Sequence, residues 1–141
     1  MAEGLFRHYA RVNSVHNRIK VRSAGIMTSQ PGAKPDQRAL RIAAANGVRL
    51  SNIRARQVTE EDLVRHELIV AMDRTHLGAL AELCLTDSSE KVSLLLSHDP
   101  GQVLEEVPDP YYGSYDRFAE VYEMIDSAVI CLLEEVVKQR L

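Results

Sequence analysis

Residues 68–73 read Leu-Ile-Val-Ala-Met-Asp, and this stretch sets the class of fold. Five consecutive apolar residues without polar alternation are typical of a strand that is buried on both faces of a parallel sheet. Asp73 then supplies a side chain that can cap a helix, which we expect to continue to about Leu83. A strand that leads directly into a helix is the repeating unit of α/β folds.

The segments around this stretch extend the alternation of strands and helices. Residues 92–96 predict a second buried strand, and the alternating residues 19–23 predict a short one. Apolar periodicity and good helix formers predict helices at 2–13, 36–46, 59–66 and 117–139. We therefore expect a single domain over residues 1–141, an α/β three-layer sandwich with a mostly parallel sheet.

Two of these helices carry clear end signals. Gly47 stands where a left-handed cap would end the helix at 36–46. Thr59 and Asp62 have the spacing of a capping box, which would start the helix at 59–66.

The composition excludes several classes of protein. Hydrophobic residues make up 45% and charged residues 26% of the 141 residues, which is typical of a globular domain and not of a disordered tail. No apolar run approaches the roughly 18 to 20 residues that cross a bilayer, and the N-terminus lacks a secretion signal pattern. We expect a cytoplasmic protein with no membrane contact.

Charge is distributed unevenly along the chain. Residues 1–56 contain eleven Lys or Arg and two acidic residues, whereas residues 57–141 contain six and eighteen. The basic part could face an anionic ligand or could be a solvated surface. Without interleaved aromatic residues or zinc spacing, we expect no nucleic acid partner.

The cysteines and histidines do not form a metal motif. Cys84 and Cys131 have no C-x-x-C spacing, and we expect both to be reduced, buried apolar residues. The five histidines are scattered and lack i, i+4 pairing, so we assign them surface or supporting roles. We expect no metal and no cofactor.

A long loop at 97–116 holds the candidate catalytic residue, Asp109. Ligands of open parallel sheets bind beyond the carboxyl ends of the strands, where such a loop lies. Pro108 and Pro110 stiffen the backbone around Asp109, and Tyr111 and Tyr112 could wall a slot for a flat substrate group. Spacing alone favours a proline-bounded turn with two packing tyrosines over a catalytic role.

Six short motifs in register extend over nearly the whole chain. They are Ala2-Glu3-Gly4, Ser23-Ala24-Gly25, Gly32 with Pro35-Asp36, Ala55-Arg56-Gln57-Val58-Thr59, Ala71-Met72-Asp73 and Asp109-Pro110-Tyr111-Tyr112-Gly113. In this order and spacing, the chain resembles the low-molecular-weight protein tyrosine phosphatases.

This resemblance implies a flavodoxin-like phosphotyrosine phosphatase fold and a defined chemistry. In the family, a cysteine attacks the phosphorus of an aryl phosphate, an arginine and backbone amides hold the phosphate oxygens, and an aspartic acid protonates the leaving phenolate. Asp109 matches that catalytic acid, and Tyr111 and Tyr112 match the aromatic residues beside the substrate slot. The expected partner is a phosphorylated protein or a small aryl phosphate.

The sequence also departs from the family pattern. The family's first, central strand runs into a Cys-x5-Arg phosphate loop, and this chain begins at the helix that follows it. Neither Cys84 nor Cys131 is followed six residues later by arginine. We therefore expect a domain truncated at its N-terminus, inactive by itself, with a distorted or open sheet that could self-associate. An aromatic residue usual in the family is replaced by Ser29, so the preference for phosphotyrosine over other phosphoryl groups, such as phosphoarginine, stays open.

Three interpretations of the departures remain. Met1 could be an internal methionine of a phosphatase whose true start lies upstream. The chain could instead be a non-enzymatic pseudo-phosphatase that binds a phosphorylated partner. Arsenate reduction on the same fold would need a relay of closely spaced cysteines, which Cys84 and Cys131 do not provide.

Overall fold

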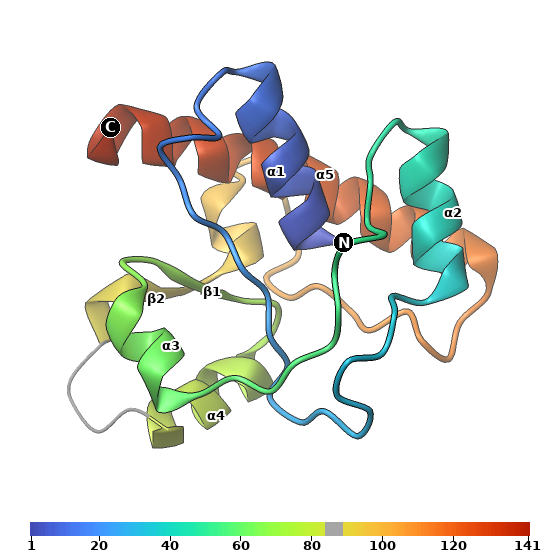
Figure 1. Ribbon diagram of the computed structural model, residues 1–141, viewed down its shortest axis with the longest axis horizontal. Helices are drawn as coiled ribbons and strands as arrows, with labels where there is room; N and C mark the ends of the chain where they lie inside the picture. The colour runs from blue at the N-terminus through green and yellow to red at the C-terminus, as the bar shows by residue number, and fades with distance from the viewer. Residues whose placement is uncertain (84–88) are drawn as a thin grey trace.

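Helices lie on both faces of a small parallel sheet in the computed structural model, which describes residues 1–83 and 89–141 (Figure 1). The sheet pairs β1 (Ile69–Ala71) with β2 (Val92–Leu94), with Ile69 opposite Val92. The other elements are α1 (Ala2–Val12), α2 (Gln37–Ala45), α3 (Glu60–Arg65), α4 (Arg74–Leu83), the 3-10 turns η1 (Ser89–Lys91) and η2 (Leu95–His98), and α5 (Tyr115–Arg140).

Alternate residues of the first strand face two separate hydrophobic clusters. Leu68, Val70 and Met72 pack against the larger cluster, which α1, α2, η2 and α5 build. Ile69 and Ala71 belong to the smaller cluster, with α3 and α4. The sheet is therefore the middle layer between two layers of helices, which confirms the predicted three-layer α/β sandwich with a parallel sheet.

The predicted capping signals are present at the helix ends. Thr59 and Asp62 form the capping box of α3, and Asp73 Oδ1 accepts a hydrogen bond from the His76 backbone N–H at 2.8 Å. Gly47 has φ +74°, and the next backbone N–H, of Val48, donates to Ala43 O at 2.8 Å. This is the glycine-dependent cap expected after α2.

The prediction of a strand at residues 19–23 was wrong. The segment forms no ladder; its backbone is held by side chains of α1 instead. Arg7 Nη2 donates to Val21 O at 2.8 Å, and the Ser23 N–H donates to Glu3 Oε1 at 2.8 Å. Because no strand lies beside this segment within the described residues, its peptide groups are satisfied by these side chains.

Element boundaries differ from the predictions at two further places. β2 ends at Leu94 and not at residue 96, because Leu95–His98 turns into η2. The last helix begins at Tyr115 and spans 26 residues, and it contributes buried side chains from Phe118 to Val136 to the larger cluster. Among the described residues, no helix has the length and apolarity to cross a bilayer.

Candidate active site

The Asp109 loop is tied to the carboxyl end of β1. Met72 follows the strand, and its carbonyl oxygen accepts a hydrogen bond from the Val107 N–H at 2.9 Å. Residues 107–113 consequently cross the edge of the sheet where ligands of parallel α/β folds bind. Asp109 was predicted at this edge, and the structure places it there.

The Asp109 carboxylate is exposed and is oriented by its own turn. Its Oδ1 accepts the backbone N–H of Tyr111 at 3.0 Å, a bond that closes a short turn over Pro110. The rings of Tyr111 and Tyr112 stand edge to face, with centroids 5.0 Å apart and planes at 86°. Tyr111 is 58% and Tyr112 95% exposed, so both rings face solvent beside the carboxylate.

Arg38 of α2 holds the same loop from the other side. Its Nη1 donates to Gly113 O at 2.7 Å and its Nη2 to Tyr111 O at 2.8 Å. The guanidinium also pairs with Asp36 at 3.0 Å and lies 4.2 Å from the ring centre of Phe118. The hydrogen bond from Arg38 holds the pKa of Asp36 below its ordinary value. Arg38 was not predicted as a site residue, although it stands two residues after the Pro35-Asp36 motif.

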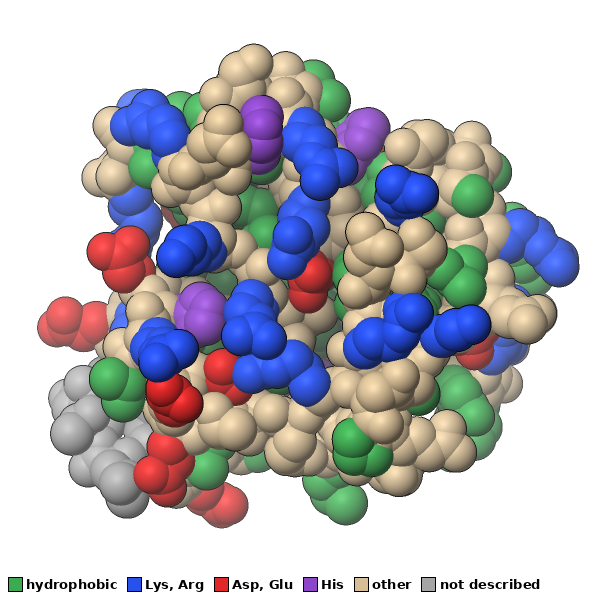
Figure 2. Space-filling view, in the orientation of Figure 1, with side chains coloured by type: hydrophobic (Ala, Val, Ile, Leu, Met, Phe, Trp, Pro, Cys, Tyr) green, Lys and Arg blue, Asp and Glu red, His purple; other side chains and the backbone are tan. Residues whose placement is uncertain are grey.

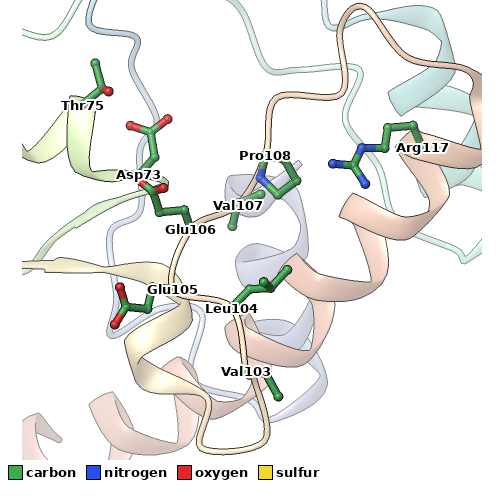
Figure 3. A pocket seen from close by; sticks show the side chains of 9 residues that line it. All are labelled: Asp73, Thr75, Val103, Leu104, Glu105, Glu106, Val107, Pro108 and Arg117. Atoms are coloured by element: carbon green, nitrogen blue, oxygen red, sulfur yellow. The ribbon is translucent and has the colours of Figure 1, made fainter.

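A pocket of about 550 Å³ opens next to this loop (Figure 3). It is lined by Asp73, Thr75, Val103, Leu104, Glu105, Glu106, Val107, Pro108 and Arg117. Glu106 Oε2 accepts the Arg74 backbone N–H at 2.7 Å at the start of α4, and Glu105 pairs with the Arg74 guanidinium. These carboxylates serve the helix end, and they make this pocket unsuited to an anion.

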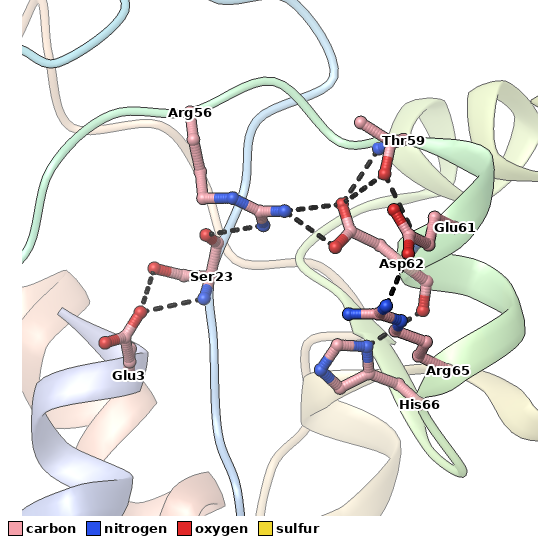
Figure 4. Close-up of polar contacts among 8 residues, drawn as sticks. All are labelled: Glu3, Ser23, Arg56, Thr59, Glu61, Asp62, Arg65 and His66. Carbon is pink, nitrogen blue, oxygen red and sulfur yellow. Dashed lines mark hydrogen bonds and ion pairs between the residues drawn. The ribbon is translucent and has the colours of Figure 1, made fainter.

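Arg56 has a structural role. Its Nη2 contacts both Asp62 oxygens, at 2.6 and 2.7 Å, and its Nη1 donates to Ser23 O at 3.3 Å (Figure 4). Ser23 is in turn bound by Glu3 through its N–H and its hydroxyl. Arg56 thus joins α3 to the extended segment, and its guanidinium is not free for a ligand.

The cysteine that the structure describes is not a prepared nucleophile. Burial, and then the nearby charge of Asp99, raise the pKa of the Cys131 thiol, so it stays protonated at neutral pH. Cys84 lies outside the described residues. Over residues 1–83 and 89–141 there is also no group of three His, Cys, Asp or Glu side chains placed to hold a metal ion.

The face that carries α1 is basic. Figure 2 shows Lys and Arg side chains gathered over this face, across α1 and the chain beside it. The two acidic residues of the first 56, Glu3 and Asp36, are both paired with arginines at 3.0 Å. Their charges are thereby compensated, and the remaining cations give this face a positive potential.

Comparisons with known proteins agree on one family. The family model described as low molecular weight phosphotyrosine protein phosphatase matches residues 1–141. The phosphatase YfkJ of Bacillus subtilis is 32% identical over 140 residues, which cover 99% of this chain and 88% of that protein. A low molecular weight protein-tyrosine-phosphatase of Streptomyces coelicolor is 38% identical over 143 residues, covering 99% and 86%. The crystal structure of YfkJ superposes with a TM-score of 0.92 at 30% identity, covering 99% of this chain and 87% of that one.

Proposed function

The chain belongs to the low molecular weight phosphotyrosine protein phosphatase family, and from that premise we propose that Asp109 is the general acid of a phosphate monoester hydrolase. The observation that carries the proposal is the fixed position of its loop. Met72 O, the Tyr111 N–H and the Arg38 guanidinium hold this loop at the carboxyl end of the sheet. A positioned carboxyl group there can protonate a leaving oxygen.

In the proposed reaction, a cysteine thiolate forms a bond to phosphorus while the bond from phosphorus to the leaving phenolate breaks. The proton of the Asp109 carboxyl passes to the phenolate oxygen. Water then attacks the phosphocysteine, gives a proton to the Asp109 carboxylate and releases phosphate. Tyr111 and Tyr112 flank the aromatic group of a phosphorylated protein or small aryl phosphate, and the basic face attracts its charge.

We further propose that residues 1–141 do not turn over substrate by themselves. Neither Cys84 nor Cys131 has an arginine six residues later, and the Cys131 thiol is protonated at neutral pH. The proposed turnover needs a Cys-x5-Arg loop, because its amides and arginine lower the thiol pKa and bind the phosphate oxygens.

The test compares two proteins in a p-nitrophenyl phosphate assay. One is residues 1–141, and the other adds, before residue 1, a strand and a Cys-x5-Arg phosphate loop of the family pattern. We expect turnover only in the extended protein, and a fall of about 10² to 10⁴-fold in its Asp109→Asn variant. Asp116→Asn, at another exposed acid of the same region, is the control and should retain activity. Turnover by residues 1–141 that depends on Asp109 would refute the requirement for an added nucleophile, and full activity of Asp109→Asn would remove its role.

A second candidate function is binding without turnover. Its support is the basic face together with the missing nucleophile, a combination that fits a module for phosphorylated partners. Calorimetric titration of residues 1–141 with a phosphotyrosine peptide and with its unphosphorylated form separates the two functions. Binding that requires the phosphate supports the module, and equal heats for both peptides exclude it.

The described sheet also predicts self-association. It has only two strands, and β1 is paired along one edge alone within the described residues. Exposed strand edges are templates for pairing with another chain. Sedimentation equilibrium of residues 1–141 should show a concentration-dependent dimer, and a monomer at all concentrations would argue against this pairing.

A further inference from the structure

A serine, a histidine and a glutamate form a continuous chain of hydrogen bonds between β2 and α5. Ser93 Oγ lies 2.7 Å from His98 Nε2, and His98 Nδ1 lies 2.5 Å from Glu135 Oε2. Ser93 comes from the middle of β2, His98 from the end of η2, and Glu135 from the last turns of α5. The His98 side chain is 11% exposed and that of Glu135 40%.

The contact with Glu135 selects which ring nitrogen of a neutral His98 carries the proton. An ionised carboxylate only accepts hydrogen bonds, so the proton of a neutral His98 resides on Nδ1, facing Glu135. Nε2 is then an acceptor, and the Ser93 hydroxyl is left to donate to it. A hydroxyl that donates to a histidine whose other nitrogen is held by a carboxylate is the arrangement that activates a nucleophilic serine.

These three side chains open into a pocket of their own. It has a volume of about 180 Å³ and is lined by Leu68, Glu90, Ser93, His98, Glu135, Val136, Gln139 and Arg140. Leu68 and Val136 supply apolar wall, and the side chains of Gln139 and Arg140 carry N–H donors that can face a developing oxyanion. A pocket this far below the roughly 300 to 1,000 Å³ of drug-sized sites admits only a short acyl group.

We propose that Ser93 is the nucleophile of a second active site, which hydrolyses esters of short carboxylic acids. Ser93 Oγ forms a bond to the carbonyl carbon while its proton passes to His98 Nε2. The bond to the leaving alcohol breaks, and the alcohol takes that proton. Water then attacks the acyl-serine, giving its proton to Nε2, and the acid leaves as Ser93 recovers its hydroxyl proton.

This site is separate from the Asp109 loop. Arg117 lines the pocket beside that loop, and Glu135 belongs to the second site. The two residues are eighteen positions apart on α5, a separation of roughly 27 Å at the helical rise per residue. The proposal therefore does not depend on phosphatase activity, and it concerns atoms that are all within residues 1–141.

The alternative is that the same bonds only clamp β2 to α5. A clamp contributes stability but leaves the hydroxyl as unreactive as any other serine. Ser97 offers the comparison within the chain, because it is exposed and its hydroxyl donates to a backbone oxygen, Leu94 O, at 2.6 Å. Reactivity of Ser93 relative to Ser97 separates a nucleophile from a clamp.

The test treats residues 1–141 with a fluorophosphonate probe and maps the labelled peptide by mass spectrometry, alongside hydrolysis of p-nitrophenyl acetate. In labelling, Ser93 Oγ bonds to phosphorus, fluoride leaves, and His98 takes the proton. We expect a label on Ser93 that is lost in Ser93→Ala and falls at least a hundredfold in His98→Asn. Ester hydrolysis should fall in parallel. Ser97→Ala and Glu134→Gln, which alter neighbours outside the hydrogen-bonded chain, should retain both.

Glu135→Gln keeps the test decisive if His98→Asn fails to fold. We expect its labelling rate to fall on the order of tenfold, less than for a fully buried triad carboxylate, because Glu135 is partly solvated. No label on Ser93 of the unaltered protein, or equal labelling in a folded His98→Asn variant, overturns the proposal. So does an undiminished rate in Glu135→Gln.

Discussion

The two ends of the sheet are organised in opposite ways. At the carboxyl end, Asp109 is held by backbone groups and by Arg38, and within the described residues its carboxylate bonds only to the Tyr111 N–H. Toward the amino end, Ser93, His98 and Glu135 bond directly to one another. In the two proposed reactions, the first arrangement positions a single acid, and the second joins its reacting groups to one another within these residues. A well-placed loop alone thus supplies an acid without a nucleophile, whereas a hydrogen-bonded serine, histidine and glutamate supply a nucleophile together with its base.

Asp99 lies between these ends, and its substitution should give the largest change in the free energy of unfolding. It is 6% exposed, accepts the Ser127 hydroxyl at 2.6 Å and the Gly101 N–H at 2.9 Å, and so fixes the start of the long loop to α5. Asp99→Asn should lower the free energy of unfolding by about 1 to 2 kcal/mol, the low end for a buried bonded carboxylate, because the side chain lies just under the surface. Urea unfolding at pH 7 measures this. Asp116→Asn, at an exposed acid, should change it little.

The same variant has a defined pH dependence. The hydrogen bond from Ser127, supported by the Gly101 N–H, holds the pKa of Asp99 below its ordinary value of 3.8 and outweighs the effect of burial. Stability from a carboxylate with a depressed pKa is present above the unfolded value and is lost as pH falls through the folded one. The gap between wild type and Asp99→Asn should therefore be constant near neutrality and shrink below about pH 3.8. A gap that widens with acid would mean that the bonds to the carboxylate are not formed.

A smaller and local effect is expected at Arg38. Arg38→Met removes the donors to Tyr111 O and Gly113 O, and hydrogen exchange of residues 111–113 should accelerate about tenfold, the factor for roughly one lost hydrogen bond. Arg41→Met, on the same helix and about 6.0 Å from the Tyr115 ring, is the matched control. Exchange around Glu135 should not change in either variant. Acceleration there as well would show that the two ends of the sheet are coupled.

Local signals in the sequence predicted most of the fold. The apolar run at 68–72, the capping box at Thr59 and the glycine at position 47 each specify structure through neighbours within a few residues, and all three were confirmed. The strand expected at 19–23 failed because a strand exists only when another backbone lies beside it. The alternation of apolar and polar residues within a segment does not show whether such a neighbouring strand is present.

The residues of the two sites also differ in whether their neighbours in the sequence reveal them. Asp109 was found because prolines and tyrosines surround it in the sequence, and the family resemblance supplied its proposed role. Arg38 contacts Tyr111 and Gly113, which lie 73 and 75 positions further along the chain. Glu135 and His98 are in contact although they are 37 positions apart. The search for i, i+4 histidine pairs excludes metal motifs, but it does not detect a histidine that bonds to a serine and a distant carboxylate. A rule that listed every Ser-x4-His pair would have selected Ser93 and His98.

The smallest expected effect distinguishes a reactive chain of side chains from a supporting one. If Ser93, His98 and Glu135 served only to join β2 to α5, Glu135→Gln would weaken that junction. It would then lower the free energy of unfolding and leave the labelling rate of Ser93 unchanged. Glu135 is 40% exposed, so its hydrogen bond with His98 is screened by solvent and should contribute less than about 0.5 kcal/mol. We expect urea unfolding of Glu135→Gln to match that of Glu134→Gln within this margin, while the labelling rate of Ser93 falls only in the former. A loss of stability without a loss of labelling would make the amino end of the sheet a clamp, and the contrast between the two ends would then disappear.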